Sequence, residues 1–135
     1  MIVVDTNIIS YLFICGEFSG QAEKVLIKDS QWAAPLLWRS ELRSVLTQYI
    51  KKEILTLEET VEIMENASAL LENNEYDIAS RQVLDLASSS NLSAYDCEFV
   101  ALAKDLNIKL VTADKRITEM FPQYSLSLQD FTIDA

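Results

Sequence analysis

The hydrophobic positions of this 135-residue chain follow two kinds of pattern. Short apolar or alternating runs predict strands, and longer stretches with apolar residues three or four apart predict helices. The predicted strands are residues 2–4, 32–34, 108–112 and 124–128, with a short one near Tyr76. The predicted helices are residues 6–13, 21–28, 36–52, 56–72, 80–89, 93–106 and 115–120.

The order of these elements predicts an α/β fold. Strands that alternate with helices along a chain usually form a parallel sheet covered by helices on both faces. We therefore predict one domain over residues 1–135, with a mostly parallel central sheet of four to five strands. The helices at 36–52 and 56–72 should form a hairpin, and Thr56 with Glu59 has the pattern of a capping box at the second helix.

The composition limits the chemistry that this fold can perform. The chain has no histidine and two cysteines, so a Ser/His or Cys/His catalytic pair is excluded and a zinc site is not expected. We expect Cys15 and Cys97 to be free, buried thiols in a reducing compartment. With two glycines, the chain also lacks both common glycine-rich phosphate-binding motifs. Chemistry must therefore use carboxylates, hydroxyls, amines or a bound cation.

The charge and the N-terminal pattern narrow the class of protein. A net charge of −10 argues against a simple nucleic-acid binder with a basic face, but it allows a nuclease with an acidic centre or a protein with a basic partner. The apolar stretch at 8–15 is too short to span a membrane. Asp5 stands where a signal peptide would carry positive charge. We therefore expect a soluble, cytoplasmic protein.

Two aspartates lie just after predicted strands. Asp5 comes after residues 2–4, and Asp114 comes after residues 108–112. In open α/β sheets, ligands bind beyond the carboxyl ends of the strands, so both side chains are candidates for a site. Both also fit the N-cap of the helix that follows, and the pattern alone leaves the two interpretations open.

Two more acids lie on predicted helices. Asp96 has the pattern of a capping box with Ser93, yet it shares a helical face with Phe99, which should pack on the sheet. Glu41 lies in mid-helix within an apolar stripe, where a carboxylate is costly unless a partner satisfies it. That partner is either a bound cation or a neighbouring arginine, Arg39 or Arg43, and a position at the edge of the stripe is the third interpretation.

Asp5, Glu41, Asp96 and Asp114 together favour a cation site. Carboxylates about 5 Å apart repel by roughly 3 kcal/mol per pair at an effective dielectric constant near 20. Several such pairs would consume much of the stability of a small domain, and a divalent cation would remove the penalty. Oxygen ligands without histidine or thiolate favour Mg²⁺ or Mn²⁺, which can activate a water molecule and neutralise charge on a phosphate.

These residues lie in segments that resemble the PIN-domain family, and specifically its VapC-like toxins from toxin–antitoxin pairs. The resemblance spans essentially the whole chain, and its segments are "IVVDTNII", "SELRSVL", "AYDCEFVALAKDLNIKLVTADKR" and the last predicted strand. It implies a PIN-like three-layer fold. Asn7 and Thr112 match small polar positions of the family, and Ala113 stands where family members often have a larger residue.

The resemblance implies a Mg²⁺- or Mn²⁺-dependent ribonuclease. Asp5, Asp96 and Asp114 would ligate the metal, directly or through water, and Glu41 would complete the catalytic set. Asn7 and Thr112 would support it. The nearest bases in sequence are Arg39, Arg43, Lys115 and Arg116. Some of these are expected to contact phosphate, although ordinary solvated charges are the alternative.

The resemblance also implies partners. It implies a homodimer and a VapB-like antitoxin, part of which would lie in a groove formed by the hairpin at 36–71. Two other functions compete with the nuclease. The first is a catalytically inactive PIN-like interaction protein. The second is a phosphomonoesterase with an aspartate nucleophile, which usually needs a second acid two residues later, where this chain has Asn7.

Overall fold

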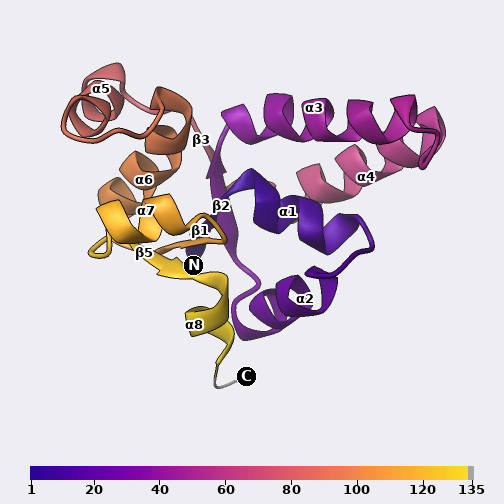
Figure 1. The fold of residues 1–135 in the computed structure, drawn as a ribbon, viewed down its shortest axis with the longest axis horizontal. Coiled ribbons are helices and arrows are strands. Elements are labelled where there is room, and N and C mark those ends of the chain that lie inside the picture. The colour runs from indigo at the N-terminus through magenta and orange to yellow at the C-terminus, as the bar shows by residue number, and fades with distance from the viewer. Residues whose placement is uncertain (134–135) are drawn as a thin grey trace.

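Five parallel strands form the centre of the computed structural model, which describes residues 1–133 (Figure 1). The strands are β1 (Ile2–Val4), β2 (Trp32–Pro35), β3 (Glu75–Tyr76), β4 (Leu110–Thr112) and β5 (Ser125–Ser127). Their order in the sheet is β3-β2-β1-β4-β5, and every pair of neighbours is parallel. The chain builds outward from β1 in both directions, so the switch in strand order lies between β1 and β4. This is where an open α/β sheet offers a crevice for a ligand.

Eight helices connect the strands and cover both faces of the sheet within residues 1–133 (Figure 1). They are α1 (Thr6–Phe13), α2 (Ser19–Lys28), α3 (Leu37–Lys51), α4 (Leu57–Leu70), α5 (Ser80–Ser88), α6 (Ala94–Leu106), α7 (Lys115–Met120) and α8 (Leu128–Thr132). The helices α1 to α4 lie on one face, where α8 packs against α2, and α5 to α7 lie on the other. The predicted three-layer α/β fold is therefore confirmed.

Helix α6 forms the centre of its layer. It contacts β1, β2 and β4, and its residues from Phe99 to Ala103 are all buried. A helix that is apolar on most of its surface belongs inside a fold, and this position fixes the start of α6 over the switch point of the sheet. Asn107 ends the helix in the left-handed conformation (φ 54°), which asparagine tolerates well.

The hairpin of α3 and α4 projects from the body of the molecule (Figure 1). Thr56 and Glu59 form the predicted capping box at the start of α4. At the other end of the hairpin, the guanidinium of Arg39 donates two hydrogen bonds to Glu75 at 2.6 and 2.7 Å. The indole of Trp38 donates to the same carboxylate at 2.8 Å. These bonds fasten the start of α3 to the edge strand β3.

Two expectations from the sequence were wrong. The last predicted strand ends at Ser127, and Leu128 begins the helix α8. The Ser127 hydroxyl accepts the backbone N–H of Asp130 at 3.0 Å, and this N-cap stops the strand pattern one residue early. Cys15 is exposed in the loop after α1, and Cys97 is buried as expected. Both thiols are free.

Within residues 1–133, no helix combines the length and the apolar character needed to cross a bilayer.

Candidate functional site at the switch point of the sheet

A pocket of about 80 Å³ lies at the carboxyl ends of β1 and β4. Its lining includes all four acids that the sequence singled out, although they come from four different segments. The lining residues are Asp5, Thr6, Asn7, Glu41, Asp96, Phe99, Asp114 and Ile117. We call this hollow the acidic pocket. Asp5 and Asp114 reach it from strand ends, Asp96 from the first turn of α6, and Glu41 from the middle of α3.

Asp5 lies at the bottom of the acidic pocket and is buried, with 7% of its surface exposed. One carboxylate oxygen accepts the backbone N–H of Ile8 at 3.2 Å, which caps α1. The other accepts a short hydrogen bond from the hydroxyl of Thr112, which is completely buried at the end of β4. The Thr112 oxygen in turn accepts the backbone N–H of Asp114 at 3.0 Å. Asp5 is thus a helix cap that also lines the acidic pocket, so the N-cap does not exclude a role in a site there.

Burial raises the pKa of Asp5 from 3.8 to about 6. The hydrogen bonds from Thr112 and Ile8 act in the opposite direction, and the negative charges of Asp114 and Glu41 add a smaller increase. Desolvation disfavours the charged form of a carboxyl group, and a nearby cation would favour it. Asp5 is therefore a group whose charge state responds to whatever positive charge enters the pocket.

Glu41 is half-buried on α3, on the side that faces α1. Its carboxylate accepts the hydroxyl of Thr6 at 2.7 Å. Burial raises the pKa of Glu41, the Thr6 hydrogen bond lowers it, and the charge of Asp96 adds to the increase. Within residues 1–133 Glu41 has no ion-pair partner, so the pairing with Arg39 or Arg43 that the sequence left open is wrong.

Asp96 and Asp114 share one guanidinium group. Arg116 donates to Asp114 through Nη2 at 2.7 Å and through Nε at 3.2 Å. The same Nη2 lies 3.5 Å from Asp96. Asp114 also caps α7, because it accepts the backbone N–H of Arg116 at 2.9 Å. The hydrogen bonds and charge of Arg116 hold the pKa of Asp114 below its usual value.

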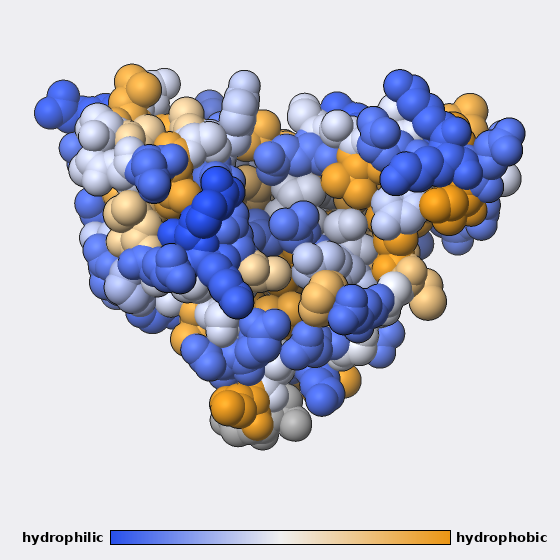
Figure 2. Space-filling model, in the orientation of Figure 1, coloured by the Kyte–Doolittle hydropathy of each residue, from blue (hydrophilic) through white to orange (hydrophobic). Residues whose placement is uncertain are grey.

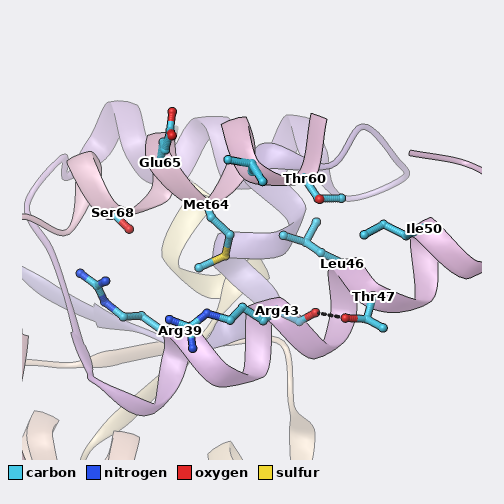
Figure 3. Close-up of a pocket in the computed structure, with 10 residues that line it drawn as sticks. Arg39, Arg43, Leu46, Thr47, Ile50, Thr60, Met64, Glu65 and Ser68 are labelled. Atoms are coloured by element: carbon cyan, nitrogen blue, oxygen red, sulfur yellow. Dashed lines mark hydrogen bonds between the residues drawn. The ribbon is translucent and has the colours of Figure 1, made fainter. Parts of the chain in front are cut away.

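The other predicted side chains divide between two places. Asn7 lines the acidic pocket and is exposed. Lys115 is exposed on α7 beside Arg116. Arg39 and Arg43 line a second hollow of about 570 Å³ between α3 and α4 (Figure 3). They are therefore not part of the acidic pocket.

Sequence analysis missed two residues that belong near this site. Thr6 satisfies Glu41, and a hydroxyl residue directly after Asp5 was a visible signal for it. Glu98 is half-buried on α6, where burial and then the charges of Glu41 and Asp77 raise its pKa. A carboxylate among the apolar residues of a helix was the argument applied to Glu41, and it applied to Glu98 as well.

The acidic pocket fits a hydrated cation better than a dry one. Among residues 1–133, no three acidic or cysteine side chains converge closely enough to form a ready-made metal cage. Mg²⁺ usually keeps several waters and takes only one or two carboxylates directly, so a set of spaced carboxylates suits it. Contrary to the expectation from the sequence, a cation is not the only group that makes these four acids tolerable. Each of them already has a protein partner, which is Thr112, Thr6 or Arg116.

The raised pKa of Asp5 predicts a stability that falls as the pH rises. The folded state holds this proton more tightly than the unfolded state, so the contribution is complete below pH 3.8 and is lost as the pH passes through about 6. Between about pH 5 and about pH 7.5 the loss should be about 1.4 kcal/mol. Urea unfolding in EDTA should show this difference when the wild type is compared with Asp5→Asn, in which Glu41 and Asp114 remain. An equal pH dependence in both proteins would contradict the assignment.

The family model described as "PIN domain" matches residues 2–121. Ribonuclease VapC3 of Pyrobaculum aerophilum is 27% identical over 124 residues, which cover 90% of this chain and 95% of that protein.

Solved structures with the same fold are less similar in sequence. A toxin–antitoxin complex from Klebsiella pneumoniae has a TM-score of 0.69 at 21% identity and covers 95% of this chain and 98% of its own. PAE2754 from Pyrobaculum aerophilum has a TM-score of 0.76 at 14% identity and covers 98% and 93%. FitAcB from Neisseria gonorrhoeae has a TM-score of 0.74 at 15% identity and covers 95% and 98%.

Proposed function

Because this chain belongs to the PIN-domain family, we propose that it is a metal-dependent endoribonuclease, the VapC-like toxin of a toxin–antitoxin pair. The observation that carries the proposal is the acidic pocket, where four carboxylates from four segments line one hollow at the switch point of the sheet. The relative named Ribonuclease VapC3, similar over nearly all of both chains, supports the choice of reaction. Because the chain has no histidine, the titratable side chains that line the pocket are the four carboxylates.

In this proposal the carboxylates hold Mg²⁺ or Mn²⁺. Asp5, Asp96 and Asp114 would be the ligands, directly or through water, since they surround the pocket from β1, α6 and the end of β4. Such an ion activates a water molecule and neutralises charge on the scissile phosphate. Thr112 fixes the position of Asp5 relative to the backbone of Asp114, because its hydroxyl is hydrogen-bonded to both. Glu41, whose pKa is raised by burial, would orient the attacking water and accept its proton.

The substrate must approach a chain with a net charge of −10, so local bases have to meet its phosphates. Lys115 and Arg116 on α7 are exposed beside the acidic pocket and are the best placed for this role. Asn7 at the rim can donate to a phosphate or a ribose hydroxyl. Arg39 is committed to Glu75 and lies with Arg43 in the other hollow, so neither is assigned to the scissile phosphate.

The hollow between α3 and α4 is the surface that we assign to the antitoxin. Its floor is apolar, with Leu46, Ile50 and Met64, and Figure 3 shows these side chains pointing toward one another between the two helices. Figure 2 shows hydrophobic side chains among hydrophilic ones over the same hairpin. An amphipathic segment fits such a groove, and the charge of −10 favours a partner that is basic overall. The proposal also includes that the chain forms a homodimer and acts in the cytoplasm.

The test is an RNA cleavage assay with the purified chain and Mg²⁺ or Mn²⁺. Internal cleavage of RNA would support the nuclease. The alternative, an inactive PIN-like interaction protein, predicts intact RNA together with no heat of Mn²⁺ binding at millimolar concentration. If Mn²⁺ binding releases or absorbs heat but no RNA is cleaved, the proposed metal site stands and the proposed ribonuclease reaction is wrong.

A further inference from the structure

Two acids that line the acidic pocket are already paired with a positive charge from the chain itself, that of Arg116. The guanidinium of Arg116 makes two hydrogen bonds to Asp114, and Nη2 lies 3.5 Å from Asp96. Two of the three proposed metal ligands therefore share one monovalent cation. An arginine fork that meets a carboxylate through two nitrogens is among the stronger pairings available to it.

We propose that Arg116 is a built-in counter-cation that a divalent ion must displace from Asp114 and Asp96 before the pocket can work. The proposal rests on the proposed function, because it concerns the same pocket. Both cations would compete for the carboxylates of Asp114 and Asp96, so a divalent ion would bind there at the expense of the Arg116 contacts. Without the metal, Arg116 offsets the repulsion between the two acids.

The exposed position of Arg116 keeps the free-energy cost of moving it away from the two acids low. About two thirds of its side chain is exposed (66%), while Asp96 and Asp114 are 28% and 22% exposed. The acids are therefore held in place, and the arginine can turn outward into water without disturbing the core. Arg116 also lies in the first turn of α7, whose backbone stays fixed by Asp114 and by the buried side chain of Ile117.

A displaced Arg116 would then be free at the mouth of the pocket. Its guanidinium, exposed on α7 beside Asp114, would be available to an RNA phosphate, which an arginine can bind through two nitrogens. Arg116 thus alternates between two anions, a carboxylate pair in the free protein and a phosphate in the loaded one. Arg116 is in this sense a positioning residue for the metal and a contact residue for the substrate.

The experiment measures Mn²⁺ binding by calorimetry to the wild type, Arg116→Ala and Lys115→Ala. Lys115→Ala is the matched control. It removes the same charge from the same turn of α7, but the Lys115 side chain makes no ion pair within residues 1–133. Loss of the competing arginine should tighten Mn²⁺ binding about fivefold, against less than about twofold for Lys115→Ala. Arg116→Lys, which keeps the charge but loses the fork, should fall between.

A second measurement follows the arginine directly. In ¹H–¹⁵N spectra, the Arg116 Nε–H signal, identified by its loss in Arg116→Ala, should move toward the position of a solvated arginine as Mg²⁺ is added. Its midpoint should match the affinity for Mg²⁺. An Arg116 signal that stays unchanged at saturating Mg²⁺ would overturn the proposal.

The outcomes separate this inference from the proposed function. Equal Mn²⁺ affinities for the wild type and Arg116→Ala, or equal gains for Arg116→Ala and Lys115→Ala, would overturn the role of Arg116 and leave the metal site intact. Absence of Mn²⁺ binding in all the proteins would overturn both.

Discussion

Asp5→Asn is expected to lower the rate of RNA cleavage at least about a hundredfold, because loss of even an outer-shell partner of a metal typically costs ten- to a hundredfold. Asp5 is buried beneath the acidic pocket and is its least solvated carboxylate. An amide has the same shape but no charge, so it would hold a divalent cation poorly. The measurement is the initial rate of cleavage of one RNA with saturating Mg²⁺.

The same substitution should leave the fold intact. The side-chain oxygen of asparagine can still accept the Ile8 N–H and cap α1, and its NH₂ can donate to the Thr112 hydroxyl. At neutral pH the thermal midpoint should not fall, because the wild type carries a desolvated charge at this position. The matched control is Asp105→Asn, the same change at an exposed position of α6. If Asp5→Asn cuts RNA as fast as the wild type, the acidic pocket is not the active site.

Removal of divalent cations is expected to abolish cleavage. With EDTA the acids of the pocket would keep the Arg116 guanidinium, their hydroxyl partners and the backbone N–H groups of the helices that they cap. None of these groups can activate a water as a metal ion does. Mg²⁺ or Mn²⁺ added in excess should restore the rate. The measurement is the cleavage rate before and after chelation, with EDTA already saturated with Mg²⁺ as the control.

Chelation should also change the stability. A cation at a hundred times its dissociation constant stabilises the folded state by about 2.7 kcal/mol, and the gain should shrink in Asp5→Asn. Thermal unfolding at neutral pH, with and without Mg²⁺, measures this difference. Undiminished cleavage after exhaustive chelation would contradict a metal-dependent reaction and favour chemistry by the carboxylates alone.

The sequence contained most of the fold because its local signals agree with its tertiary structure. Apolar runs gave β1 and β4, and the aspartate after each run pointed to the carboxyl edge of the sheet. Glu41 was informative because an apolar stripe makes a charged residue conspicuous. The order of the strands in the sheet could not be predicted from local patterns. It depends on which strand edge remains free for β4 after β1, β2 and β3 have paired.

The partners of the four acids were harder to predict. Thr112 lies 107 positions from Asp5, and no local pattern relates two residues so far apart. The assignment of Arg39 and Arg43 could have been improved with helix geometry alone. Each lies two positions from Glu41, which places it about 200° around the helix, so both arginines face away from that carboxylate. Figure 3 shows them together in the hollow between α3 and α4.

The outer strands of the sheet are very short, with two residues in β3 and three in β5. They therefore offer few free backbone groups to which a strand from another molecule could add, and Glu75 brings a charged pair to one of these edges. Short edge strands of this kind are expected to lower the tendency of the chains to pair edge to edge. We therefore expect an assembly of several copies to use helix surfaces rather than strand edges.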